Sequence, residues 1–226
     1  MSSSSVYRLA GWGLGVAGGA WLITSLFSDL VIGGQDPSHA SSSLYGPAQA
    51  AMFLAGSLVA LALVGHYARR SAAYGKLALA GLVALFLSIV LFGAVSAIGA
   101  TFVPWLEASA TGRHMLSGNN GPSALFFFFI GATLLQVVGC ITYGIANWRA
   151  GMSKVAAVLL IASGVLAVPG FIAGGPDSQI PAVVGDLPGL LFLAGLAWLG
   201  FEVAFERTAR VDRGAALQPA RTGGAA

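Results

Sequence analysis

Charge is what this sequence lacks most. Only 8% of its 226 residues are Asp, Glu, Lys or Arg, whereas 57% are hydrophobic. An ordinary soluble domain carries roughly 25% charged residues. A water-soluble fold could not cover so much apolar surface, but lipid can replace water around apolar helices. The scarcity of charge therefore excludes an ordinary soluble domain and indicates a membrane protein.

Cysteine is also scarce, because Cys140 is the single one in the sequence. One thiol cannot form an internal disulfide or a Cys-based metal site, and its apolar surroundings favour a packing role. The sequence also has no Gly-Lys-Ser or Gly-Lys-Thr, no His-Glu-x-x-His, and no Gly-x-Ser-x-Gly elbow with a suitable His partner. We therefore expect no metal and no cofactor, and an enzymatic role is disfavoured.

Six long apolar runs are what the sequence does contain. A membrane crossing by an α-helix needs about 20 mainly apolar residues. The segments between the runs are rich in Gly, Pro, Ser and Asn, which interrupt helices. The predicted fold is all-α, a polytopic transmembrane bundle of six helices over residues 1–207, followed by a flexible cytoplasmic tail over 208–226. The predicted spans are 9–32, 48–67, 77–103, 123–147, 155–173 and 187–205.

The basic residues are distributed unevenly between the two sides of these spans. Ten of the 11 Lys and Arg residues lie on one side, and Arg113 lies alone on the other. Cytoplasmic loops carry an excess of Lys and Arg, so the distribution predicts cytoplasmic N- and C-termini in a bacterial-type plasma (inner) membrane. Because the basic residues sit at helix ends, not in one patch, we expect no nucleic acid partner. The expected partner is the lipid bilayer. A membrane protein partner or a second copy of the chain is also possible at this stage.

Small residues recur at helical spacing in the first run. Gly11, Gly15 and Gly19 are each four residues apart, which places them on one helix face. In lipid, helices associate by close packing, and small residues permit a close approach. These glycines are therefore predicted to pack against another helix.

A weak internal pattern raises the hypothesis of three repeated helical hairpins. Phe-x-x-Gly occurs near the start of every second span, at 53–56, 128–131 and 192–195, and Gly-Gly-x-Asp occurs at 33–36 and 174–177. Repeated units of this kind can define a fold. A chain with 32 glycines also produces such matches by chance, so both interpretations stay open.

Polar residues at membrane depth are costly, and each is a candidate for function or for a structural contact. The candidates for binding are Gln136, Glu202 and His66. Gln136 lies near the middle of its span, where a helix-to-helix hydrogen bond competes with substrate binding. Glu202 and His66 have similar predicted depths and could form a proton relay, or could simply face the interface, with Glu202 paired to Arg70.

Two acidic residues are predicted near the side of the membrane opposite to the basic helix ends. Asp29 lies near the end of the first span and Asp186 precedes the last. Together they could receive a cation, but we expect them to be water-exposed acids at the interface.

No motif identifies a known family, so three functions remain as hypotheses. The first is an integral membrane protein that acts as a non-enzymatic accessory or scaffold subunit, and it is favoured by short loops and little buried charge. The second is a small transporter or channel for a weakly polar or lipid-like solute. The third is an intramembrane enzyme acting on lipid or quinone, for which no catalytic constellation is visible.

Overall fold

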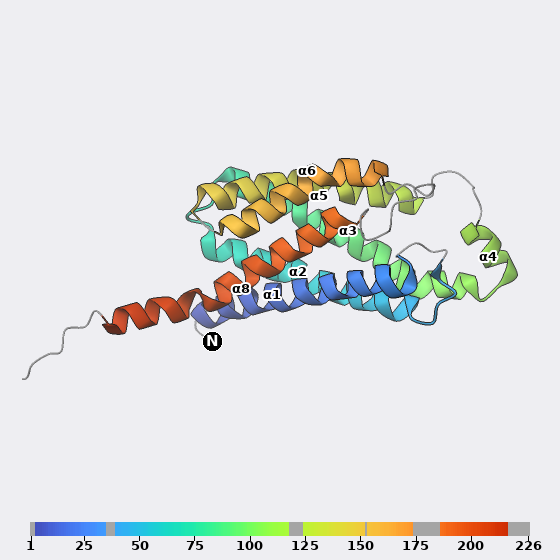
Figure 1. The fold of residues 1–226 in the computed structure, drawn as a ribbon, viewed down its shortest axis with the longest axis horizontal. Coiled ribbons are helices and arrows are strands. Elements are labelled where there is room, and N and C mark those ends of the chain that lie inside the picture. Colours follow the sequence, from blue (N-terminus) through green and yellow to red (C-terminus); the bar gives the residue numbers. More distant parts are fainter. Residues whose placement is uncertain (1–2, 35–38, 118–123, 152, 174–185, 217–226) are drawn as a thin grey trace, which may run out of the picture.

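The structure is a computed structural model of the chain, and it describes residues 3–34, 39–117, 124–151, 153–173 and 186–216. The described residues are 89% helical and contain no strand. Figure 1 shows the long helices running roughly along one axis. The predicted all-α class is therefore confirmed.

The helices follow the predicted runs closely. The first, α1, spans Ser3–Phe27 and continues into a wider π-helical turn, η1, over Ser28–Ile32. The other long helices are α2 (Tyr45–Arg70), α3 (Lys76–Glu107), α5 (Ala124–Arg149), α6 (Lys154–Ala173) and α8 (Leu187–Ala216). A short helix, α4 (Ala110–Ser117), lies at the end of α3 (Figure 1).

The long helices form a closed ring in chain order. The helices α1, α2, α3, α5, α6 and α8 each pack against the next, and α8 returns to pack against α1. Short connections at 71–75 and 150–153 join antiparallel neighbours. The end of the bundle with these two connections is called the basic end here, because Arg69, Arg70, Lys76, Arg149 and Lys154 flank them. The opposite end, where Asp29 and Asp186 lie, is called the acidic end.

The centre of the ring is packed with apolar side chains. Fully buried residues come from helices all around the ring, so one core joins them. Leu14, Leu63, Leu85, Leu160 and Leu196 each expose no measurable surface. Dense packing of this kind stabilises helices in lipid, where the hydrophobic effect between helices is missing.

The outer surface is apolar as well. Leu30, Leu61 and Ile23 are each about 70% exposed, at 72%, 70% and 69%. Exposed apolar side chains in such numbers would be unfavourable in water but are suited to lipid. Among the residues that the structure describes, five helical segments are long and apolar enough to cross a membrane, and the shorter segment Lys154–Pro169 is also apolar. The chain is therefore a membrane-embedded protein. The five segments are Arg8–Ile32, Tyr45–Arg70, Lys76–Glu107, Phe127–Arg149 and Leu187–Phe205.

The structure differs from the sequence prediction mainly at helix ends. The helix α4 was not predicted, because its eight residues are too few and too polar to produce a hydropathy signal. The last helix continues past Phe205 to Ala216, since its polar residues have no proline or glycine pair to stop it before Gly214. The second Gly-Gly-x-Asp pattern, at 174–177, lies outside the described residues.

The predicted glycine face of α1 lies against α8. A side-chain carbon added at Gly11 would lie 2.9 Å from Val203 Cγ1 and 3.0 Å from the backbone nitrogen of Ala204, and one added at Gly15 would lie 2.9 Å from the Phe201 ring. Gly19 differs, because no atom of the described residues lies within 4 Å of such a carbon. The contact instead continues through Gly18, which faces the backbone of Ala197.

Candidate functional site

Gln136 joins two neighbouring helices near the middle of the bundle. It is buried on α5, and its Nε2 donates to Ser163 Oγ of α6 at 3.5 Å. The thiol of Cys140, one turn further along α5, lies 3.8 Å from the same hydroxyl. All three side chains are buried, so these polar groups hold α5 and α6 together.

Glu202 forms a contact within its own helix. Its Oε1 accepts a hydrogen bond of 3.1 Å from Trp198 Nε1, one turn earlier on α8. From α2, the Arg69 side chain reaches α8 and donates to the carbonyl oxygen of Val203 at 3.1 Å. Glu202 is therefore held at the rim of the basic end by Trp198.

His66 lies inside the bundle and not among lipid headgroups. Only 1% of its surface is exposed, and its Nδ1 shares a hydrogen bond of 2.8 Å with the hydroxyl of Tyr143. Its Nε2 is buried and has no hydrogen-bond partner among the described residues. The α2 helix therefore presents an imidazole to the interior, because His66 follows Val59 and Leu63 on the same buried stripe.

Aromatic rings surround this imidazole. The ring of Tyr74 lies 6.2 Å from His66 and 5.7 Å from Tyr143, and it stacks on Tyr67 at 5.7 Å. The Tyr74 hydroxyl donates to Asn147 Oδ1 at 2.6 Å, and Asn147 Nδ2 donates to the Tyr143 carbonyl at 2.8 Å. We call His66, Tyr67, Tyr74, Tyr143 and Asn147 the tyrosine cluster. It ties α2, α5 and the connection before α3 together.

Burial raises the pKa of Tyr74, the cluster member that lies in the connection between α2 and α3. The pKa of Tyr74 is raised to about 12, mainly because burial disfavours the phenolate, and contacts with Tyr143 and Arg70 lower it in part. Tyr74 thus stays a neutral hydrogen-bond donor across the physiological pH range. This arrangement was not predicted from the sequence, in which Tyr67, Tyr74 and Tyr143 resemble interfacial anchors.

The three residues predicted as binding candidates lie in different surroundings. Gln136 contacts α6, Glu202 contacts Trp198, and His66 belongs to the tyrosine cluster. The charged groups that act on His66 are Arg70 and Arg69. The geometry thus divides the predicted set into three separate local contacts.

The acidic end holds a second polar group. Asp29 is only 7% exposed, which differs from the water-exposed acid expected from the sequence. It lies on the stripe that already buries Trp21 and Ser25, because positions 21, 25, 28 and 29 share one helix face. Asp186, at the start of α8, lies within hydrogen-bonding reach of its carboxyl group. The two carboxyl groups expected near one level are therefore neighbours.

The backbone around Asp29 departs from a regular α-helix. The π-helical turn Ser28–Ile32 ends at Gly33, whose φ of 100° is readily adopted only by glycine. The amides of Gly33 and Gly34 both donate to the carbonyl of Ser28, at 3.0 and 3.1 Å. Short π-helical segments occur frequently at functional sites. This turn fixes Asp29 where α1 meets α8.

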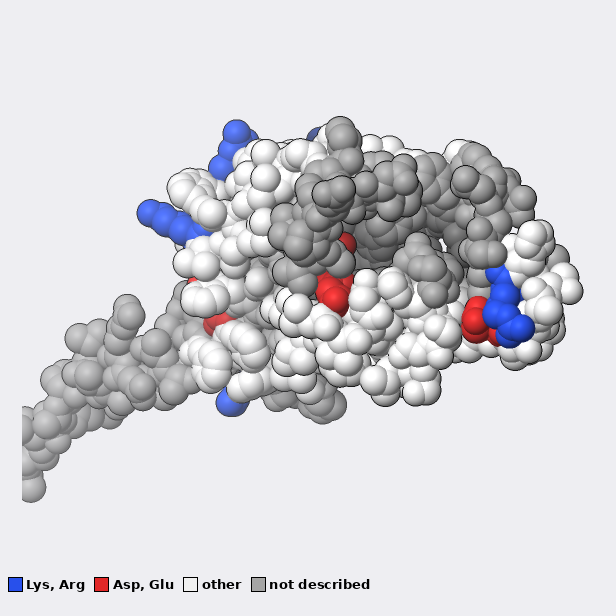
Figure 2. All heavy atoms as spheres, turned by 45° about the vertical axis from the view of Figure 1, so that its right-hand side comes forward, with Lys and Arg blue, Asp and Glu red and all other residues white. Residues whose placement is uncertain are grey.

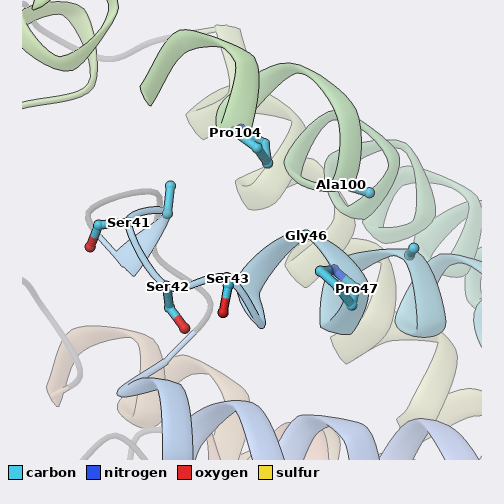
Figure 3. A pocket seen from close by; sticks show the side chains of 9 residues that line it. Ser41, Ser42, Ser43, Gly46, Pro47, Ala100 and Pro104 are labelled. Atoms are coloured by element: carbon cyan, nitrogen blue, oxygen red, sulfur yellow. The ribbon is translucent and has the colours of Figure 1, made fainter. Parts of the chain in front are cut away.

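A shallow hollow also lies at the acidic end, between the start of α2 and the end of α3. It has a volume of about 450 Å³ and is lined by small and uncharged residues. Figure 3 shows the serine segment on one side and Ala100 and Pro104 on the other. Because it offers hydroxyl groups but no charged side chain, the hollow has little means of selecting a ligand.

Charged side chains are distributed along the bundle as the sequence predicts. Figure 2 shows Lys and Arg of the described residues gathered toward one end, with a further basic group near acidic side chains at the other. At that other end, Arg113 Nη1 donates to the carbonyl oxygen of Glu107 at 2.9 Å. Within the described ranges, no three His, Cys, Asp or Glu side chains are grouped closely enough to hold a metal ion.

Comparison with known proteins gives no further guide to function. No family model, no curated protein and no solved structure matches this chain.

Proposed function

We propose that this chain is a six-span integral membrane protein that serves as a non-enzymatic accessory or scaffold subunit. We place it in a bacterial-type plasma membrane with the basic end and both termini in the cytoplasm. The proposed sixth span is α6, which is 20 residues long and packs between α5 and α8. A helix of 20 residues is about 30 Å long, which matches the hydrocarbon thickness.

The observation that carries this function is the filled centre of the ring. Met52, Val59, Leu63 and Leu199 expose 1% of their surface or less and occupy the core with the other apolar residues. A transporter or channel needs polar or charged groups along a path. Among the described residues, the buried side chains of Ser25, Ser88 and Gln136 instead bond neighbouring helices. His66 bonds Tyr143 inside the core. These contacts favour a packing role.

The three-hairpin hypothesis fits the ring but has mixed support. The pairs α1–α2, α3–α5 and α6–α8 each pack together. However, Phe192 is buried at 3% exposure, whereas Phe53 and Phe128 are 38% and 47% exposed. The repeat stays a proposal about architecture, on which the function does not depend.

The proposed orientation is tested by cysteine labelling. In a Cys140→Ser background, Ser71→Cys lies at the basic end and Ser41→Cys at the acidic end, and both positions are exposed. An impermeant maleimide should label Ser41→Cys in intact cells and Ser71→Cys only after the membrane is opened. Labelling of both from the same side would contradict the six-span arrangement.

The subunit role is tested on the purified full chain. Extraction in a mild detergent from its native membrane should give one defined assembly larger than the 22.8 kDa protomer. The chain alone in liposomes should give no flux of ions or small solutes. A purely monomeric chain in the native membrane, or flux carried by the chain alone, would overturn this proposal.

A further inference from the structure

Asp29 is a buried carboxyl group without a donor. Both of its oxygens are buried and accept no hydrogen bond from the described residues. Asp29 as a whole is more than nine-tenths buried, with 7% of its surface exposed. A buried carboxylate ordinarily has a basic partner or several hydrogen-bond donors. The end of α1 therefore presents an acceptor that has no donor among the residues that the structure describes.

The group that faces this acceptor is a second carboxyl group. Asp186, the residue before α8, lies within hydrogen-bonding reach of Asp29, and the two interact electrostatically. Two carboxylates repel each other, so they stay close only when positive charge lies between them. That charge is either a shared proton or a bound cation.

The surroundings provide access from one side. Asp186 as a residue is exposed, although the atoms packed around its carboxyl group raise its pKa. The pair thus has a buried member on α1 and a member on α8 that reaches the surface. Figure 2 shows acidic side chains reaching the surface in the middle of the view.

Within the described ranges, the other titratable groups near this point do not supply the missing positive charge. From the loop, the ring of His39 packs over Gly33, beyond the π-helical turn. The first two turns of α2, residues 45–52, carry no acidic or basic side chain. Among the described residues, Asp186 is the charged group that faces Asp29 from α8.

We infer that Asp29 and Asp186 form a binding site for one hard divalent cation of the Mg²⁺ or Ca²⁺ class. Such ions prefer carboxylate and carbonyl oxygens and complete their coordination with water. The site does not depend on the scaffold function proposed above. The bound cation would bridge Asp29 and Asp186 and so link α1 to α8 at the acidic end.

Cation binding at this pair displaces a proton. Without a cation, one proton shared by the pair leaves a net charge of minus one. When a divalent cation binds, that proton leaves to water, and the two carboxylates together neutralise the ion. Cation binding should therefore release about one proton per site and should weaken as the pH falls.

The test uses the full chain in detergent micelles, stripped of metals by a chelator. The thermal midpoint and the release of protons are measured as CaCl₂ or MgCl₂ is added at pH 8 and at pH 5. The variants are Asp29→Asn and Asp186→Asn, which keep the side-chain shape and remove the charge. The control is Glu107→Gln, an acid at the same end of the bundle whose side chain has no part in the pair.

At pH 8 we expect the thermal midpoint to rise by about 5 °C or more at a hundredfold excess of cation over Kd. The rise should be much smaller at pH 5, absent in both Asn variants and retained in the control. If Asp29→Asn fails to fold, Asp186→Asn at the exposed position gives the same test. The inference is overturned if neither ion shifts the midpoint, if the shift persists in the Asn variants, or if binding at pH 5, where the pair holds its proton, releases no protons. Stabilisation by acid alone, with no response to either ion, would identify a proton-sharing pair and would equally overturn the cation site.

Discussion

The contact between α1 and α8 allows the sharpest prediction, because Gly200 has no room for a side chain. A carbon added there would overlap the backbone nitrogen of Gly15 and lie 2.7 Å from both Gly15 Cα and Gly11 O. Carbon atoms normally approach to about 3.5–4.0 Å. In Gly200→Ala, the two helices must therefore separate by about 1 Å over the glycine face.

The cost follows from two opposing effects. Inserting a methyl group into a packed core costs about 1–3 kcal/mol, and the upper end applies here because the obstructing atoms are backbone. Alanine is the better helix former by about 1 kcal/mol. The net expectation for Gly200→Ala is a loss of about 2 kcal/mol, or about a 30-fold change in the unfolding equilibrium.

A control on the same helix removes the steric effect. At Gly189 no atom of the described residues lies within 4 Å of an added carbon, so Gly189→Ala should be neutral or stabilising by up to about 1 kcal/mol. Reversible unfolding in mixed detergent–SDS micelles measures both variants. The close contact between α1 and α8 would be refuted if Gly200→Ala unfolded at the same SDS fraction as Gly189→Ala.

Three further predictions concern the tyrosine cluster and the cysteine. Tyr143→Phe leaves the buried His66 without its 2.8 Å partner, so the free energy of unfolding should fall by about 1–3 kcal/mol, and an unchanged value would argue against that bond. Since the pKa of Tyr74 is raised from 10.0 to about 12, its contribution to stability should be complete below pH 10 and lost as the pH rises through 12; absorbance at 295 nm should show one tyrosine ionising near pH 12 that is missing in Tyr74→Phe. Cys140 is fully buried, so maleimide should react with it only after unfolding, and rapid labelling of the folded chain would place it elsewhere.

Much of the fold follows from hydropathy alone. Apolar runs bounded by breakers predict most helix ends to within a few residues, the start of α1 and the end of α8 excepted. The reason is that in lipid every backbone group must be satisfied within its own helix. The same rule explains the failures. The helix α4 lies at the end of the bundle, where its polar sequence follows local preferences that hydropathy does not report.

The polar residues were harder to interpret because their surroundings depend on helix rotation. Asp29 could have been recognised as buried from its place on the stripe of Leu14, Trp21 and Ser25, since residues three and four apart share a face. Its neighbour Asp186 is 157 positions further along the chain, and only the closure of the ring brings the two together. For the same reason, His66 and Tyr143 gave no sequence signal as a pair.

The closed ring also has a consequence for synthesis. The glycine face of α1 has α8 as its partner, yet α1 is translated well before α8. In a growing chain the N-terminal parts generally fold earlier. Until α8 has been inserted, α1 must therefore stay in the lipid with its glycine face unpacked, and the insertion of α8 completes the ring.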